Sequence, residues 1–443
     1  MFEVSTLADA EVRPIRIFSR PAPAVALADV LATGPAGEAV AWDPPCGPAA
    51  VAFGATHRIV GEGARRFAQV SAASERLWRR LRRDVGDDSP APRVWGGFAF
   101  APGAARQGPW EAFGDASFTL PRLCYWRDGD RAWMQGIGSA DDGTLDDDVD
   151  RAIASLRGIA RAAGDARAAR AYQGPGVVDP VDRHAWTSRI DAILAAIGRG
   201  RVDKVVAALC TRVVFDASPT AAQVLASLRD ETGPVRRFVF TRPGASFVGA
   251  SPELLVARSA DELRSEALAG TIARADGAAA ALLASAKDRA EHAFVREAIA
   301  AALAPLCERF DVPEEPQVRE LRRLLHLATP MRGRLSGDTH VLELCERLHP
   351  TPATCGTPRD TALAMIRASE EAPRGWYASP VGWFDARGDG EFAVALRCAL
   401  IARDGVRVYA GAGIVSGSDP TREREEVEIK QQAILSALGL GDA

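Results

Sequence analysis

Residues 236–270 decide the fold class, and they read RRFVFTRPGASFVGASPELLVARSADELRSEALAG. Short apolar runs rich in Phe, Val, Leu and Ala are separated here by Gly, Pro, Ser and Asp, which favour turns. The pattern predicts four consecutive strands, at 237–241, 246–249, 253–257 and 263–268, with a hairpin at residues 259–261. Strands that follow one another without helices between them favour an antiparallel sheet.

The segments on either side of this run extend the pattern. A helix is predicted at 182–198 and a buried strand at 204–215. Further along the chain, the sequence predicts helices at 279–309, 338–347, 359–370 and 420–438, and strands at 377–384, 391–402 and 407–410. Because strand clusters and helix clusters are segregated, the predicted fold class is α+β with antiparallel sheets.

The first part of the chain has a weaker pattern. Residues 93–100 predict a strand with a close backbone approach at its glycines, and a hairpin is predicted over Asp128-Gly129. An Ala- and Arg-rich helix is predicted near residues 150–170. The loop at 173–176 then divides the chain into an N-terminal half, 1–175, and a second half, 176–443.

Composition excludes several classes of protein. The 443 residues carry 54 Lys plus Arg and 58 Asp plus Glu, a net charge of −4, which does not suggest a nucleic-acid or acidic-membrane binder. The seven cysteines form no CxxC pair, and an odd number argues against a full disulfide framework. No signal-peptide pattern and no run of 18 apolar residues are present, so we expect a cytoplasmic protein.

Two pairs of acidic residues could bind a metal ion. Asp288 and Glu291 are spaced to share one helix face, and Glu423 and Glu426 repeat the spacing on the last helix. Carboxylate oxygens on two elements suit a hard cation such as Mg²⁺. The same spacing is also common on helix faces that point into water, and Glu426 could instead form an ion pair with Lys430.

A lysine and a glutamate stand at the starts of two apolar strands. Lys204 either extends its ammonium group to the surface or is desolvated and acts as a base. Glu253 is either an exposed carboxylate at a strand edge or a buried carboxyl that stays protonated and serves as a general acid.

Other residues could bind an anion. Arg397 ends the apolar run 392–397, and a buried Arg needs a partner, either a substrate carboxylate or an internal Asp or Glu. Gly411-Ala412-Gly413 could offer backbone N–H groups to an anion. His349 is either a structural or a site residue, and Cys355 is interpreted as a packing residue.

Eight segments in this order resemble those of the chorismate-binding enzymes. They are KVV at 204–206, GASPELL at 249–255, ALAGT at 267–271, KDRAEH at 287–292, LHPTPATCGTPR at 348–359, YASPVGW at 377–383, AVALR at 393–397 and AGAGIVSGSDP at 410–420. WGGFAF at 95–100 resembles the N-terminal half of the same family. The resemblance implies a single large α+β domain, in which two facing antiparallel sheets have helices outside and the active site between them.

The resemblance also implies chemistry. In this family Mg²⁺ bridges acidic side chains and a carboxylate of chorismate, and Glu291 and Glu426 match the ligands, with Glu423 and Asp288 close by. Members that add water carry a Lys where this chain has Lys204, whereas members that add ammonia have Gln or a similar residue there. Isochorismate synthase is therefore the expected activity: Lys204 deprotonates a water that attacks C2, and Glu253 protonates the departing C4 hydroxyl.

The resemblance also implies which residues contact the substrate, and two positions differ from the family pattern. Arg397, Gly411 and Lys430 resemble groups that orient carboxylates, and Ala269 cannot form the covalent adduct that aminodeoxychorismate synthases make through a Lys. The other expected contacts are Gly270, Thr271, His349, Gly356, Thr357, Tyr377, Ala412 and Gly413. Leu209 and Ile429 depart from the Arg and Asn that are usual in the family.

The expected partners follow from the same reading. We expect chorismate to be the substrate. We expect no redox cofactor and no glutaminase subunit, and we expect the protein to be a monomer. The alternative function is salicylate synthase, which adds pyruvate elimination to isochorismate formation. The amino-acid sequence around Cys355 resembles that of enzymes that release isochorismate. The pathway that uses the product, menaquinone or siderophore synthesis, stays open.

Overall fold

The computed structural model describes residues 13–84, 88–162, 172, 174–231 and 233–441, and it forms the four strands predicted in 236–270. They are β12 (Arg236–Arg242), β13 (Ala245–Ser251), β14 (Leu254–Ser259) and β15 (Glu262–Ala273). Strands β12 and β13 pair antiparallel in one sheet, and β14 and β15 pair antiparallel in the other, through the hairpin predicted at 259–261. The chain therefore changes sheets at Pro252 and Glu253.

The first sheet has thirteen strands among the described residues. Its order is β10 (Gly176–Val178), β11 (Lys204–Phe215), β23 (Gly405–Ile414), β22 (Cys398–Ala402), β13, β12, β2 (Ala39–Asp43), β3 (Ala49–Phe53), β8 (Leu123–Asp128), β9 (Arg131–Ser139), β1 (Ile15–Pro21) and β5 (Leu81–Arg83), with β19 (Gly356–Thr357) paired to β11. Its pairs are antiparallel except for β1 with β5.

The second sheet has ten strands in the same part of the chain. Its order is β16 (Cys307–Asp311), β18 (Leu324–Leu335), β15, β14, β21 (Gly390–Val394), β20 (Pro380–Phe384), β6 (Val94–Phe98), β7 (Ala116–Leu120) and β4 (His57–Gly61), with β17 (Gln317–Glu320) paired to β18. A core that contains Trp42 and Phe247 of the first sheet and Trp95 and Val381 of the second lies between the sheets.

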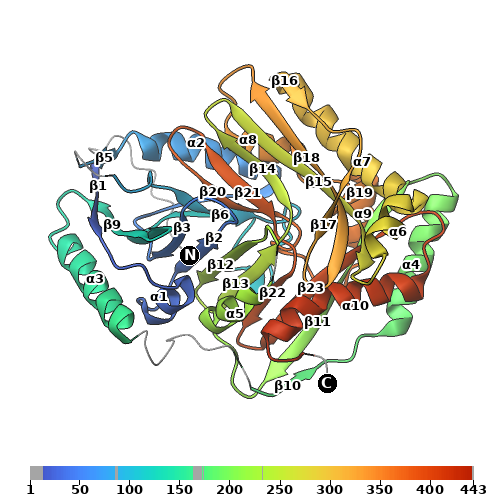
Figure 1. Cartoon of the computed structure of the whole chain (residues 1–443), viewed down its shortest axis with the longest axis horizontal. Coiled ribbons are helices and arrows are strands. Elements are labelled where there is room, and N and C mark those ends of the chain that lie inside the picture. Colours follow the sequence, from blue (N-terminus) through green and yellow to red (C-terminus); the bar gives the residue numbers. More distant parts are fainter. Residues whose placement is uncertain (1–12, 85–87, 163–171, 173, 232, 442–443) are drawn as a thin grey trace.

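Helices lie outside the sheets (Figure 1). They are α1 (Leu27–Thr33), α2 (Arg66–Trp78), α3 (Leu145–Ala162), α4 (Arg183–Gly198), α5 (Ala221–Ser227), α6 (Ala278–Ala284), α7 (Ala286–Leu303), α8 (Val341–Leu348), α9 (Arg359–Ser369) and α10 (Pro420–Ala437). Helices α3, α5 and α10 contact the first sheet, and α2, α7 and α8 contact the second. The predicted α+β class with two facing sheets and outer helices is confirmed. No helix of the described residues is long and apolar enough to cross a membrane.

Two predicted elements are wrong in their bounds. The helix predicted at 279–309 is two helices, because Ser285 adopts an extended conformation and caps α7 by accepting a hydrogen bond from the Asp288 backbone N–H. The strand predicted at 391–402 is also two strands, β21 and β22, which belong to different sheets. The chain crosses between them at Arg397, whose φ is 47°. Arg397 thus lies in a crossing turn and not, as expected, within a strand.

Strand β18 was not predicted at all. It pairs with β15 along nearly its whole length, and the register shifts between Ala269 and Thr271. The bulge is at Gly270, whose φ of 76° is a left-handed conformation that favours glycine. It lies beside the side chains described next.

Candidate active site

A cavity opens where β11 and β23 of the first sheet approach β15 and β18 of the second. Helices α7 and α10 complete its wall through Glu291, Glu426 and Lys430. Of the residues expected at the site, the wall contains Glu253, Ala269, Gly270, Thr271, Glu291, Tyr377, Arg397, Gly411, Gly413, Glu426 and Lys430. Residues far apart in the sequence are thus gathered around one space.

Lys204 is buried beside the cavity, at the start of β11 in the first sheet, and does not itself line the wall. Only 1% of the residue is exposed, so the alternative of an ammonium group at the surface is wrong. Its Nζ donates to Glu291 Oε1 at 2.8 Å. Burial alone raises the pKa of Glu291, but the lysines around it outweigh burial, and the pKa is lowered below its usual value. Glu291 is therefore an ionised carboxylate beside Lys204.

Glycines make room for this lysine. Gly356 pairs with β11 in the short strand β19, and a Cβ on it would lie 2.1 Å from the Lys204 carbonyl oxygen. A Cβ on Gly413 would lie 2.7 Å from both Lys204 Cε and Glu291 Oε1. Gly356 and Thr357, which are expected substrate contacts, pair with the backbone of Lys204 and Val205 and do not line the cavity.

Glu253 reaches the cavity from the segment that enters the second sheet. It is 2% exposed, so the exposed alternative is wrong for this residue too. Burial, reinforced by the charge of Glu266, raises the pKa of Glu253 to about 8, although Lys204 and Lys430 act in the opposite direction. Its carboxyl is therefore mostly protonated near pH 7, which is the state a general acid requires.

Like Glu291, the carboxylates of Glu426 and Glu423 are each paired with a lysine. Glu426 Oε1 lies 2.6 Å from Lys430 Nζ, and Glu423 Oε1 accepts a hydrogen bond of 3.2 Å from Lys287 Nζ. Glu423 is buried and does not line the cavity. Asp288 also lies outside the cavity wall, where its carboxylate accepts from the Ser285 hydroxyl.

These carboxylates fit a magnesium ion by their chemistry, since Mg²⁺ prefers carboxylate oxygens together with substrate oxygens. Within the described ranges, however, no group of three or more His, Cys, Asp and Glu side chains is arranged to hold a metal. Glu291, Glu423 and Glu426 are each paired with a lysine instead.

Arg397 has a partner that the sequence did not reveal. Its guanidinium donates to Nε2 of His326 on β18 at 2.8 Å, and His326 Nδ1 lies 2.9 Å from the Thr271 hydroxyl. Burial and the neighbouring Arg397 lower the pKa of His326 well below its usual value. The imidazole is therefore neutral, so Nε2 accepts from Arg397 and Nδ1–H can donate to Thr271.

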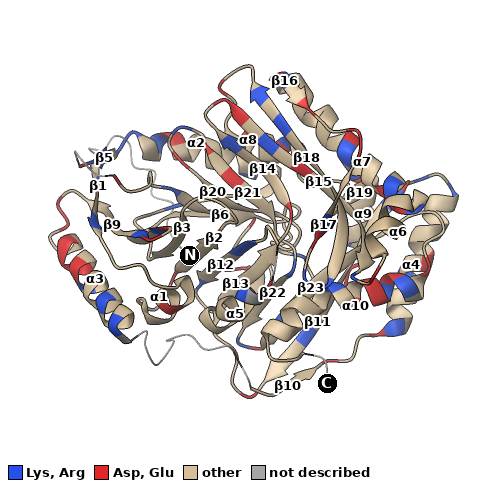
Figure 2. Ribbon diagram, in the orientation of Figure 1, with Lys and Arg blue, Asp and Glu red and all other residues tan. Residues whose placement is uncertain are grey.

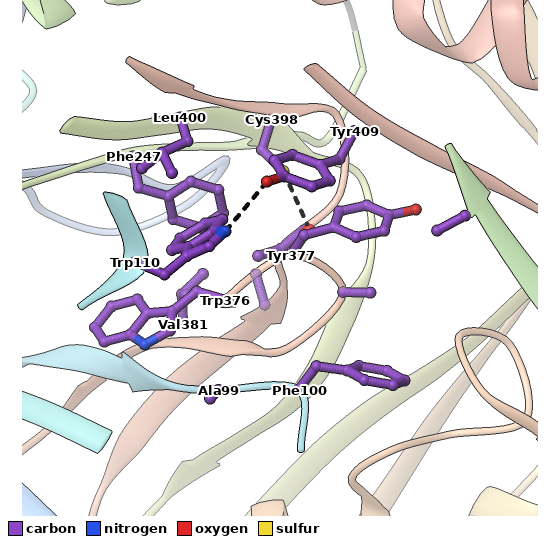
Figure 3. Packing of buried hydrophobic residues seen from close by; sticks show 14 of the residues in the cluster. Ala99, Phe100, Trp110, Phe247, Trp376, Tyr377, Val381, Cys398, Leu400 and Tyr409 are labelled. Carbon is purple, nitrogen blue, oxygen red and sulfur yellow. Dashed lines mark hydrogen bonds between the residues drawn. The ribbon is translucent and has the colours of Figure 1, made fainter. Parts of the chain in front are cut away.

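An aromatic stack supports the wall at Tyr377. Its ring lies 5.2 Å from that of Tyr409, and Trp110 Nε1 donates to the Tyr409 hydroxyl at 3.1 Å (Figure 3). A Cβ on Gly411 would come within 3.1 Å of the Tyr377 hydroxyl oxygen. Lys430 Nζ donates to the carbonyl of Gly411 at 3.0 Å, which fixes the lysine head near this wall.

Two further expected contacts, His349 and Ala412, also lie outside the cavity wall. His349 Nε2 donates to the Phe100 carbonyl at 3.0 Å, and the ring packs beside Phe67 and Phe100, so His349 connects the two halves of the chain. Ala412 pairs with Ala207 in the first sheet. Neither lines the cavity, and Cys355 is buried as expected of a packing residue.

Sequence analysis missed several wall residues besides His326. They are Val206, Pro252, Leu268, Ala353, Thr354, Ala378, Leu396 and Ala410. Most are apolar and flank a motif residue that was identified, so adjacency to a motif is the signal that could have found them.

Similarity to known proteins agrees with this geometry. The family model described as "Chorismate binding enzyme" matches residues 10–439. The salicylate biosynthesis isochorismate synthase of Pseudomonas aeruginosa is 38% identical over 87% of this chain and 82% of its own length. The isochorismate synthase MenF of Bacillus subtilis is 33% identical over 79% of this chain and 75% of its own.

Solved structures show the same relationship. The menaquinone-specific isochorismate synthase MenF of Escherichia coli has a TM-score of 0.77 and 29% identity, with 96% of this chain and 95% of that chain covered. The fold, the gathered motif residues and the family match agree along nearly the whole sequence. The chain therefore belongs to the family of chorismate-binding enzymes.

Proposed function

We propose that this protein is an isochorismate synthase, an isomerase that moves a hydroxyl group on the chorismate ring. The observation that carries the proposal is the pair of Lys204 and Glu253. Both are buried: Glu253 lines the cavity where the chain enters the second sheet, and Lys204, in the first sheet, is hydrogen-bonded to Glu291 of the cavity wall. A base and an acid that reach a ring from two sides suit the addition of one hydroxyl and the loss of another.

The reaction exchanges one water for another. Lys204, in its neutral form, takes a proton from a water whose oxygen forms a bond to C2. The ring double bonds shift and the C4–O bond breaks, while the protonated Glu253 gives its proton to the departing hydroxyl. Water is consumed at C2 and released at C4, so the substrate and product are isomers.

Other residues hold the substrate in place. Arg397, fixed by His326, and Lys430, fixed by Gly411, are cations that would bind carboxylates at the wall. Glu291 and Glu426, with Glu423 nearby, would hold Mg²⁺, which when bound supplies positive charge to the ring carboxylate. The chemistry needs no redox cofactor, and with water as the nucleophile it needs no glutaminase subunit. We also propose a cytoplasmic monomer.

The names of the relatives agree with this activity. The Pseudomonas aeruginosa, Bacillus subtilis and Escherichia coli proteins compared above are all named isochorismate synthases. These names include menaquinone and salicylate pathways, so they support the reaction and leave the pathway open.

Product analysis tests the proposal. Purified protein with chorismate and Mg²⁺ should give isochorismate at equilibrium with chorismate, with little salicylate, and chromatography of one reaction separates the three compounds. Accumulation of salicylate and pyruvate in step with chorismate loss, without an isochorismate pool, would replace the proposal with salicylate synthase. Formation of an aminated product with ammonia, but none with water, would contradict the role of Lys204.

A further inference from the structure

Lysine is rare in this chain, and its positions are not random. Of the 54 Lys plus Arg residues, only three are lysines: Lys204, Lys287 and Lys430. Every other basic residue coloured in Figure 2 is therefore an arginine. Each of the three lysines pairs with a different carboxylate at the site, Glu291, Glu423 or Glu426. Lys204 and Lys430 have roles in the proposed reaction, whereas Lys287 has none.

Lys287 connects two helices at the edge of the site. It lies in the first turn of α7, and Glu423 lies in the first turn of α10. The lysine side chain is 52% exposed, whereas the Glu423 side chain is only 4% exposed. The ammonium group thus reaches from the solvent side to a carboxylate that is otherwise buried.

The helix does not account for this lysine. A cation near the N-terminus of a helix is opposed by the helix dipole, which favours acidic residues there. An ammonium group is also a compact, strongly hydrated charge, whereas an arginine would hold a carboxylate with a bidentate fork. A lysine at this position makes an ion pair that is easier to break than an arginine pair.

We propose that Lys287 is a tethered counter-cation, which neutralises Glu423 in the metal-free protein and is displaced when Mg²⁺ binds. This inference rests on the proposed function, because it assumes that Mg²⁺ uses the carboxylates of this site. Lys287 therefore holds the Glu423 carboxylate in place through the ion pair and, by competing for it, weakens the binding of Mg²⁺.

Calorimetric titration of Mg²⁺ into the full chain tests the proposal. Lys287→Gln should bind Mg²⁺ about two- to fivefold more tightly than the unmodified protein, the range that corresponds to a partly exposed ion pair. Lys287→Arg keeps the charge and should bind no more tightly than the unmodified protein. Arg289→Gln is the matched control, since it removes the same charge two residues along α7 from a pair with Glu315 and should leave affinity unchanged.

Equal or weaker Mg²⁺ binding by Lys287→Gln would overturn the proposal and would make Lys287 a residue that positions Glu423 for the metal. A second measurement uses the unmodified protein. With only three lysines, acetylation of each amine can be followed by mass spectrometry of its peptide. Mg²⁺ should speed acetylation of Lys287 severalfold, and an unchanged or slower rate would contradict displacement.

The two experiments separate this inference from the proposed function. If the unmodified protein binds Mg²⁺ but Lys287 does not respond, only the counter-cation role fails. If the unmodified protein neither binds Mg²⁺ nor needs it for isochorismate formation, the metal part of the proposed function fails and the inference fails with it.

Discussion

The two halves of the chain both build the sheets, but they contribute very unequally to the cavity. Strands of the first half, such as β2 and β6, pair directly with β12 and β20 of the second half. All residues that line the cavity nevertheless fall between Val206 and Lys430. We propose that residues 1–175 brace the fold and that residues 176–443 carry the chemistry.

The first half acts on the site through packing. Trp95 and Trp126 contact each other, and Arg93 lies over the ring of Trp383 from the second half. The Phe100 carbonyl accepts from His349, and the Arg374 guanidinium lies over the Phe100 ring. Substitutions in the two halves should therefore differ in kind, with loss of activity in one and loss of stability in the other.

The largest effect should come from the metal site. Chelation with excess EDTA should abolish isochorismate formation, because the carboxylates lose the cation that binds substrate. The Glu291→Gln/Glu426→Gln double variant should be inactive at any Mg²⁺ concentration. A coupled assay of isochorismate measures both, with circular dichroism to show that the double variant is folded. Full activity in EDTA would remove the metal from the mechanism.

Loss of the base should be nearly as severe. Lys204→Ala should reduce kcat by about 10²–10⁴-fold, the usual contribution of a general base. Lys287→Ala is a suitable comparison, since it removes another lysine of the site that takes no part in proton transfer, and its kcat should fall far less. Near-normal turnover by Lys204→Ala at neutral pH would exclude this lysine as the base.

A smaller, graded effect is expected from pH. Glu253 must be protonated to act as an acid, and burial raises its pKa to about 8. Below pH 8 most of Glu253 is protonated, so activity should stay high. Above pH 8 the protonated fraction falls, and the rate should decrease by up to about tenfold for each pH unit. Rates measured from pH 6 to 10 at saturating Mg²⁺ check this, with circular dichroism at each pH as the control for unfolding. A profile that stays flat to pH 10 would show that Glu253 is not the acid.

The smallest effect on activity should follow a core substitution in the first half. Trp126→Phe removes buried volume and the hydrogen bond from Trp126 Nε1 to Gln135 Oε1. It should lower the free energy of unfolding by about 1–3 kcal/mol, measured by denaturant titration, while kcat of the folded protein stays within about twofold. A large fall in kcat without a change in stability would break the proposed division between the halves.

The elements predicted best from the sequence are those that depend on patterns within a few neighbouring residues. The strands in 236–270 and their hairpin were predicted because turn residues and apolar runs are visible within a few positions of each other. The crossing at Arg397 was missed because an apolar run does not reveal which sheet each part joins. Strand β18 was missed because the run that holds it, around Pro330, carries no clear alternation.

The site was predicted in part for the same reason. Lys204 and Glu253 were identified by their places in motifs, but the pairing of Lys204 with Glu291 joins residues 87 positions apart and required the fold. His326 was overlooked because a lone histidine outside a motif has no distinguishing pattern. His349 stands in a motif and looked like a contact, although its hydrogen bond to Phe100 gives it a structural role.

The interleaving of the halves has a consequence for the synthesis of the protein. Strand β6 is made early, but its partner β20 leaves the ribosome nearly three hundred residues later, as does part of the core around Trp95. At ordinary translation speeds this delay is on the order of tens of seconds. During that time one edge of β6 has no neighbour, and one edge of β2 has none until β12 is made. Unpaired strand edges invite pairing with other chains. We therefore expect nascent chains stalled before residue 236 to be bound by chaperones and to aggregate on release, whereas chains completed to residue 443 close both sheets and are protected.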